Sequence, residues 1–308
     1  MYRENSPRLT KKARLTTLER DTIGIHLIET LELSMKLQFL LLALLVPFAA
    51  CGDDGSGSSI RDGAPGQQSD ATIVIDEESR VAQYIRSTTY SKMVLEIDSV
   101  PGFEPRAAAQ SKLLGQLDSI LDKPDGITVV NDGTLTSRGE DHAWTDAELF
   151  ALADENFDLA VDDQTIKMHV LFIDGSSARD TNSGRILGLA WSNTHLVMFK
   201  QTIEDTCSSN LTPPLLRESL CEGAEFSIWL HEVGHLLGLV NTGLSMVNDH
   251  QDEERGAHDV SDACVMYWAY EGEAAVDVLR DRLIGGNQEA LEFDAECLAD
   301  IAAVRDAP

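Results

Sequence analysis

The chain has 308 residues, of which 43% are hydrophobic and 25% are charged. These values are ordinary for a globular protein, and the length suffices for one or two domains with a buried core. The formal net charge of −28 at pH 7 is not ordinary. It argues against nucleic acid as a partner and favours a soluble, self-repelling surface outside the cytoplasm.

The N-terminal region contains an export signal. Residues 35–51, MKLQFLLLALLVPFAAC, place one lysine before an apolar run that is too short to span a membrane, followed by small residues before Cys51. This segment resembles the signal peptide of a bacterial lipoprotein, which implies cleavage before Cys51, lipidation of that cysteine, and anchoring to a membrane of the cell envelope. An ordinary secretory signal is the alternative, and either one implies export.

The segments on both sides of this signal are not expected to fold. Signal peptides begin near the initiating methionine, so we interpret residues 1–34 as an upstream translation artefact or a disordered extension. Residues 51–70 are rich in glycine, serine and aspartate and are predicted to form a flexible tether. No internal repeat or second linker follows, so residues 71–308 are predicted to form one domain with a variable C-terminal tail.

Hydrophobic periodicity in the first half of this domain predicts strands that alternate with helices. Thr145, followed three residues later by Glu148, is a capping-box signature, and Asn131-Asp132-Gly133 is typical of a turn. Such alternation predicts an α/β (α+β) domain with a mixed sheet. The predicted helices are residues 107–121 and 145–156, and the predicted strands are residues 92–97, 126–130, 165–173 (the central strand), 185–191 and 195–200.

Residues 226–241, FSIWLHEVGHLLGLVN, are predicted to form a helix with two different faces. His231 and His235 lie one turn apart, so both imidazoles can reach one metal ion, and Glu232 can reach water beside that ion. Gly238 is a suitable end for this helix because glycine tolerates positive φ. A core helix with two incidental histidines is the alternative, although both histidines avoid the apolar stripe. That stripe consists of Phe226, Trp229, Val233, Leu236, Leu237 and Val240.

Four cysteines remain when Cys51 is set aside, which in an exported chain suggests two disulfides with three possible connectivities. Cys207–Cys221 would close a short loop before the histidine helix. Cys264–Cys297 would then tie the following segment to the C-terminal region. We favour this pairing, and the other two remain open. The sequence contains no C-x-x-C, so a separate cysteine zinc site is not expected.

The string formed by His231, Glu232, His235 and Gly238 resembles the H-E-x-x-H-x-x-G motif of the metzincin clan of zinc metallopeptidases. In that clan a third ligand follows the glycine, and a Met-turn forms a hydrophobic floor beneath the metal. Asn241 stands where the third ligand is expected. Residues 264–267, CVMY, are similar to the Met-turn of the archaemetzincins, and the resemblance covers about residues 185–267.

The resemblance implies a metzincin-like zincin domain with a mixed twisted sheet, an active-site helix, a Met-turn at Met266 and Zn²⁺ as cofactor. Archaemetzincin spacing places the third histidine eight residues before Met266, at His258, and makes residues 242–257 an insertion. His250 and Asn241 are the alternative ligands. The implied activity is that of a membrane-anchored zinc metalloendopeptidase acting on proteins or peptides, with Glu232 as general base. An inactive metzincin-like surface lipoprotein that binds a partner is the alternative.

Three further features are open to two interpretations. Tyr267 or Tyr270 could stabilise an oxyanion or simply pack. The strand at residues 186–191 could be an edge strand that an extended peptide joins, or an interior strand. Acidic residues in the insertion could bind calcium, but their irregular spacing favours a solvated loop. These residues are Asp249, Asp252, Glu253 and Glu254.

Overall fold

The computed structural model describes residues 79–307, apart from residues 183 and 210. The export signal, the tether and Cys51 lie outside the described residues, so their assignments stay predictions. Among the described residues, no helix combines the length and apolar character that crossing a membrane requires.

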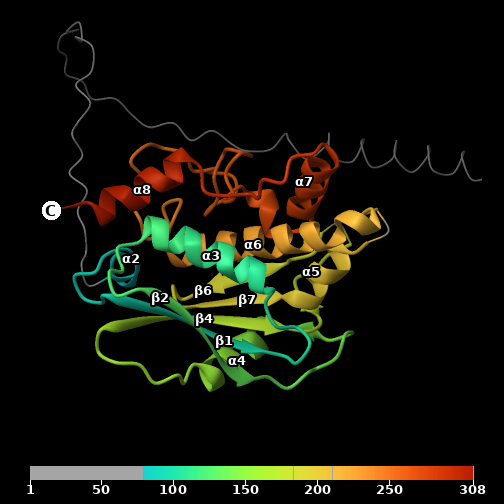
Figure 1. Ribbon diagram of the computed structural model, residues 1–308, viewed down its shortest axis with the longest axis horizontal. Coiled ribbons are helices and arrows are strands. Elements are labelled where there is room, and N and C mark those ends of the chain that lie inside the picture. Colours follow the sequence, from blue (N-terminus) through green and yellow to red (C-terminus); the bar gives the residue numbers. More distant parts are fainter. Residues whose placement is uncertain (1–78, 183, 210, 308) are drawn as a thin grey trace, which may run out of the picture. The chain divides into compact units, whose positions relative to one another are not determined.

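A five-stranded sheet organises the described residues, with the strand order β2-β1-β4-β7-β6 (Figure 1). The pairs formed by β1, β2, β4 and β7 are parallel, and β6 joins β7 antiparallel at one edge. This arrangement confirms the predicted α/β class, the mixed sheet and the central position of residues 165–173. The strands are β1 (Lys92–Ser99), β2 (Ile127–Thr134), β4 (Thr165–Ile173), β6 (Gly188–Trp191) and β7 (His195–Phe199).

Both faces of the sheet are covered, because successive side chains of the central strand enter two different cores. Val170 and Phe172 pack in the larger core, towards α3 and α6, whereas Leu171 and Ile173 pack in the smaller core, towards α4. Figure 1 shows α3 and α6 on one face of the sheet, with α7 beyond α6 and α8 at the far end against α3, and α4 on the other face. The bounds are α3 (Ala107–Ile120), α4 (Asp146–Asn156), α6 (Arg217–Leu236), α7 (Glu273–Ile284) and α8 (Ala295–Arg305).

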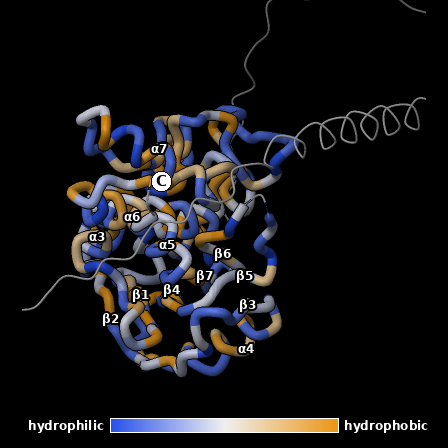
Figure 2. Tube along the Cα trace, turned by 90° about the vertical axis from the view of Figure 1, so that its right-hand side faces the viewer, coloured by the Kyte–Doolittle hydropathy of each residue, from blue (hydrophilic) through white to orange (hydrophobic). Residues whose placement is uncertain are grey.

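Smaller elements complete the domain. A two-stranded sheet lies beside α4, as Figure 2 shows. The C-terminal region, for which the sequence predicted no element, contains a 3-10 turn and α7, which pack on α6, and α8, which contacts α2 (Arg80–Ile85) and α3. The other smaller elements are β3 (Ala143–Trp144), β5 (Ser176–Ser177), α5 (Lys200–Cys207), η1 (Pro214–Leu216) and η2 (Trp268–Glu271).

A local sequence signal predicted the structure correctly where side chains form hydrogen bonds with the backbone at the start of a helix. Thr145 accepts a hydrogen bond from the Glu148 N–H, and the Glu148 carboxylate accepts one from the Thr145 N–H, so the capping box at the start of α4 is confirmed. The predicted turn at residues 131–133 is wrong, because these residues continue β2 beside β1. A Cβ at Gly133 would lie 2.0 Å from Asp98 Oδ1, so glycine here admits the Asp98 carboxylate rather than forming a turn.

The histidine helix differs from its predicted bounds. It begins at Arg217 instead of residue 226 and ends at Leu236 instead of residue 241. Gly238 has φ +73°, and the N–H of Leu239 donates to the carbonyl of Gly234 at 3.1 Å, so the chain leaves the helix at the glycine. The predicted apolar stripe is buried, but the opposite face is buried as well, because β6 and the loop after the helix cover it.

One of the two predicted disulfides is present in the structure. Cys207 and Cys221 form a disulfide that joins α5 to α6, as predicted. The predicted Cys264–Cys297 disulfide is wrong: both are buried free thiols whose Sγ atoms lie 3.5 Å apart. The Cys264 thiol donates to Cys297 Sγ, and the Cys297 thiol donates to Asp259 Oδ2 at 3.7 Å, so the two thiols form a hydrogen-bonded chain that ends on a carboxylate.

Candidate metal centre

Two histidines of α6 bring their ring nitrogens together. His231 and His235 are one helical turn apart, and their Nε2 atoms are separated by 3.1 Å. The His231 side chain is fully buried and its Nδ1 lies 2.6 Å from the carbonyl oxygen of Val265. An N–H at Nδ1 donates to that carbonyl, which leaves the lone pair of Nε2 facing His235.

The environment keeps these imidazoles neutral. Burial, followed by the proximity of His235, lowers the pKa of His231 to about 3. Burial also lowers the pKa of His235, and the neighbouring Glu271 opposes this effect without outweighing it. A neutral imidazole is the form that binds metal ions.

His258 reaches the same point from a small hairpin that is formed by the end of the predicted insertion and the residues directly after it. The Asp252 N–H donates to the His258 carbonyl at 2.8 Å, and the Asp259 N–H donates to the Met266 carbonyl at 2.9 Å. The hairpin is thus tied to the loop that contains Met266. The His258 ring lies 5.4 Å and 5.2 Å, centroid to centroid, from those of His231 and His235.

The alternative third ligands lie elsewhere. His250 is buried between two carboxylates, with Nδ1 2.6 Å from Asp259 Oδ2 and Nε2 2.9 Å from Asp300 Oδ2. Burial lowers the pKa of His250, but these carboxylates outweigh burial and raise it overall. Asn241 is exposed with φ +61°, and its side-chain amide donates to Gln251 Oε1 at 3.2 Å. The structure therefore brings His258 to His231 and His235, and it brings neither alternative there.

Glu271, at the end of η2, joins the cluster, and sequence reasoning missed it. Its Oε1 lies 2.9 Å from His258 Nε2 and 3.8 Å from His235 Nε2. One ligand atom from each of His231, His235, His258 and Glu271 lies within 4.8 Å of every other. Burial raises the pKa of Glu271, but hydrogen bonds with His235 and His258 outweigh it and lower the pKa well below its usual range. The only sequence signal was a carboxylate shortly after the Met-turn.

Glu232 lies beside this cluster against β6. It is 1% exposed, and its Oε1 has no hydrogen-bond partner among the described residues. Burial, together with the charge of Glu271, raises its pKa well above the usual range. Glu232, His235, His258 and Glu271 line a cavity of about 310 Å³ whose other wall is the edge strand and the turn after it, residues 189–193.

Met266 packs directly under α6. A Cβ at Gly234 would lie 2.3 Å from Met266 Sδ, so the glycine between the two histidines is what admits the methionine. The sequence analysis predicted this position for Met266, as the hydrophobic floor beneath the metal. Tyr267 and Tyr270 contact each other with ring centroids 5.4 Å apart, and the Tyr270 hydroxyl donates to the Asp262 carbonyl at 2.7 Å. Neither tyrosine lines the cavity.

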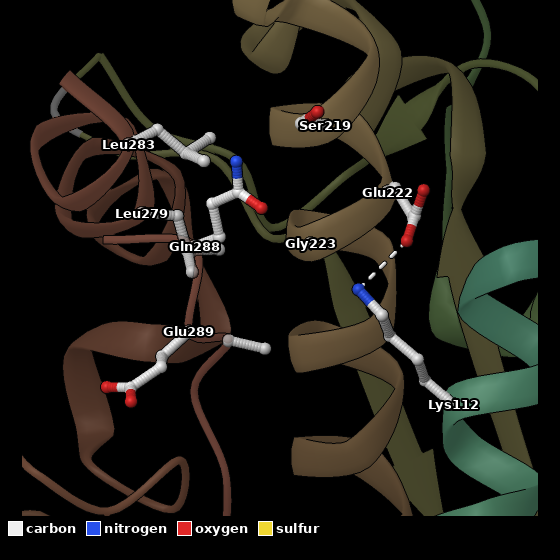
Figure 3. Close-up of a pocket in the computed structure, with 9 residues that line it drawn as sticks. Lys112, Ser219, Glu222, Gly223, Leu279, Leu283, Gln288 and Glu289 are labelled. Atoms are coloured by element: carbon white, nitrogen blue, oxygen red, sulfur yellow. Dashed lines mark ion pairs between the residues drawn. The ribbon is translucent and has the colours of Figure 1, made fainter. Parts of the chain in front are cut away.

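Among the described residues, no other group of potential metal ligands contains more than one histidine. Figure 3 shows a separate cavity of about 250 Å³ beside α6, where Lys112 pairs with Glu222 at 2.8 Å. Within the described part of the chain, the acidic residues of the insertion do not gather into a group able to hold a metal ion. Asp252 instead accepts a hydrogen bond from the Glu254 N–H at 3.0 Å, which stabilises a turn.

Comparison with known proteins gives a fold resemblance at low identity. No protein-family model matches the sequence. No curated protein matches it either. An archaemetzincin from Methanopyrus kandleri is 14% identical with a TM-score of 0.43, covering 70% of this chain and 97% of its own. A zinc-dependent peptidase from Methanocorpusculum labreanum is 16% identical with a TM-score of 0.40, covering 68% of this chain and 99% of its own. At this level of similarity, function must be inferred from the chain's own residues.

Proposed function

We propose that this chain is a zinc-dependent endopeptidase. The observation that carries the proposal is the convergence of the ring nitrogens of His231, His235 and His258 on one point, with the unpaired carboxylate oxygen of Glu232 beside them. The Nε2 atoms of His231 and His235 lie 3.1 Å apart, and a ring nitrogen of His258 joins them from a separate hairpin, which is the arrangement that a shared metal ion requires.

The donor set fits zinc. Nδ1 of His231 faces the Val265 carbonyl, and Nδ1 of His258 faces the Arg255 carbonyl at 2.9 Å, so both rings can turn an unprotonated Nε2 towards the cluster. Three neutral imidazoles are a known ligand set of catalytic zinc sites. Bound there, Zn²⁺ would lower the pKa of a coordinated water towards about 7 and polarise the carbonyl to be attacked.

Glu232 is placed to move the proton. Its carboxylate lines the cavity next to His235, and no other described side chain competes for Oε1. In the proposed reaction Glu232 takes a proton from the attacking water and later delivers it to the leaving amine. The buried position also keeps bulk water away from this transfer.

The edge strand offers a surface for an extended peptide. The Phe199 N–H donates to the Leu187 carbonyl, so in the antiparallel ladder the N–H and C=O of Gly188 and Ala190 point away from β7. These groups face the side of the cavity, and a substrate strand could pair with them. A substrate held along its backbone would be cut internally, which supports endopeptidase action over removal of terminal residues.

The location of the protein is also part of the proposal. The export signal and Cys51 support a lipid anchor on a membrane of the bacterial cell envelope, with secretion as the outcome if the signal is an ordinary one. Labelling of cells with an alkyne fatty acid should mark the wild-type chain and should not mark Cys51→Ser.

The chain produced from Met35 provides the test of the activity. We expect about one zinc per chain and cleavage of casein or a peptide library. Glu232→Gln should retain zinc and lose roughly a hundredfold to ten-thousandfold in rate. Absence of stoichiometric zinc, or unchanged hydrolysis by Glu232→Gln, would contradict the proposal. Stoichiometric zinc without cleavage of any peptide would favour a partner-binding lipoprotein or an enzyme for a non-protein amide.

A further inference from the structure

Glu271 lines the cavity and completes a group of four potential ligands with the three histidines. Its Oε1 lies 2.9 Å from His258 Nε2 and 3.8 Å from His235 Nε2, while the two Nε2 atoms of α6 are 3.1 Å apart. A tetrahedral zinc site with bonds of about 2.05 Å has ligand atoms about 3.3 Å from one another. Two of the three measured separations are slightly shorter than this value and one is longer, so the spacing is compatible with ligands of one zinc ion.

The hydrogen-bonding pattern of His258 calls for a cation next to Glu271. Nδ1 of His258 faces the Arg255 carbonyl at 2.9 Å, so a neutral ring places its only N–H there. Nε2 then presents a lone pair towards the Glu271 carboxylate, and two electron-rich atoms at 2.9 Å repel each other unless a proton or a metal ion lies between them. A metal ion in this position would also be within reach of the ring nitrogens of His231 and His235, which a proton on His258 would not bind.

The main chain holds Glu271 in place while its side chain keeps access to solvent. The Leu187 N–H donates to the Glu271 carbonyl at 3.0 Å, and Gly272 forms an isolated bridge with Ile186, so the end of η2 is fastened to the start of the edge strand. The side chain itself is 45% exposed. It can therefore rotate out of the cluster without disturbing the backbone.

We propose that Glu271 is a fourth protein ligand of the metal and that it closes the centre in the resting protein. Closed four-ligand sites are typical of structural zinc, whereas catalytic sites keep one position open. The Glu271 carboxylate must accordingly turn towards solvent and leave its position at the metal before each substrate can be attacked. This inference rests on the proposed zinc site, and it supplies a restraint on a peptidase within the domain itself.

The test compares Glu271→Gln with Glu273→Gln, a matched control two residues away. Glu273 is 43% exposed and pairs with Arg185 instead of the histidines, so the control removes the same charge at similar exposure. Zinc affinity is measured by competition with a chromogenic chelator. Access to the metal is measured by titrating the Co²⁺-substituted proteins with acetohydroxamate and following the visible spectrum. Neither measurement depends on hydrolysis.

Glu271→Gln should bind zinc at least about tenfold more weakly than wild type, because a ligand is lost. It should bind acetohydroxamate at least about tenfold more tightly, because no carboxylate has to be displaced first. A residue that only positions His258 would weaken zinc binding without improving hydroxamate binding, and that result would overturn the inference. So would identical behaviour of Glu271→Gln and wild type. Failure of wild type to take up zinc at all would instead overturn the proposed function.

Discussion

Gly188 of the edge strand is in contact with Glu232 of α6, and a Cβ at position 188 would lie 2.6 Å from both Cγ and Oε1 of Glu232. The strand proposed to bind the substrate therefore also sets the position of the proposed general base. Glycine is required here by the close approach of the two elements, and the backbone conformation itself does not demand it.

Gly188→Ala should push the Glu232 carboxylate out of place. We expect roughly a hundredfold loss in kcat, because displacement of a catalytic group by about 1 Å has this effect. Zinc content should not change, since no ligand is moved. Gly184→Ala is the control, because a Cβ at that position meets nothing within 4 Å. Equal activities of the two variants would show that Glu232 is not the base or that its position is not critical.

The third ligand can be identified by comparing two histidine substitutions. His258→Ala should abolish stoichiometric zinc binding while the fold is retained, because the His258 side chain contacts Glu271 and the Arg255 carbonyl but no buried charge. His250→Ala should keep zinc but lose about 3–5 kcal/mol of unfolding free energy, because Asp259 and Asp300 would remain buried without their partner.

Zinc content by mass spectrometry and urea denaturation monitored by circular dichroism separate the two effects. His250→Gln retains one side-chain donor and serves as the milder variant if His250→Ala does not fold. Loss of zinc in the His250 variants, with zinc kept in His258→Ala, would assign the third ligand to the other histidine.

Gly234 and Met266 should behave as a coupled pair. Gly234→Ala places a Cβ 2.3 Å from Met266 Sδ, so we expect the variant to lose about 1–3 kcal/mol in unfolding free energy through overpacking. The matched control is Gly223→Ala in the same helix, where the added Cβ meets nothing and higher helix propensity should stabilise by up to about 1 kcal/mol. The double variant Gly234→Ala/Met266→Ala should lose less than the sum of the single losses. Additive losses would mean that the two residues do not interact.

A buried ion pair fastens the start of α5 to α6. The Lys200 ammonium donates to the Glu225 carboxylate, and both side chains are almost completely buried. Lys200→Met should lower the unfolding free energy by about 3–5 kcal/mol, because Glu225 is left charged in the interior, and Lys200→Met/Glu225→Gln should recover part of the loss. Lys92→Met, which removes an exposed pair with Asp162, should leave the urea midpoint nearly unchanged. A small effect of Lys200→Met would indicate that Arg106, 3.8 Å from Glu225, compensates fully.

Local sequence rules predicted the elements whose stability is local. The capping box at Thr145 and the apolar run of β4 depend on neighbouring residues only, and both were found where expected. The turn predicted at residues 131–133 failed because tertiary pairing with β1, and the fit of Gly133 against Asp98, outweighed a local turn preference. Two helices after η2 were missed because their burial depends on tertiary packing, of α7 against α6 and of α8 against α2 and α3, which no local window contains.

The site was predictable to the extent that it lies on one helix. Helical spacing brings His231 and His235 together, and the spacing of eight residues before Met266 in the sequence indicated His258. Glu271 was not predictable in the same way, because its contact with His258 depends on how η2 meets the edge strand. The Cys264–Cys297 disulfide was predicted from the number of cysteines alone. That number does not reveal that Asp259 accepts a hydrogen bond from the Cys297 thiol.

His250 ties the hairpin that contains His258 to the C-terminal helix, because it contacts Asp259, next to His258, and Asp300 on α8. The Val247 N–H also donates to Asp300 Oδ1 at 2.6 Å. The C-terminal helix is therefore a brace for the hairpin that presents His258. Shortening the chain before residue 295 would remove the Val247 contact, which His250→Ala leaves in place, as well as the His250 contact. Such a truncation would therefore disable metal uptake from a distance, although none of the removed residues belongs to the metal centre.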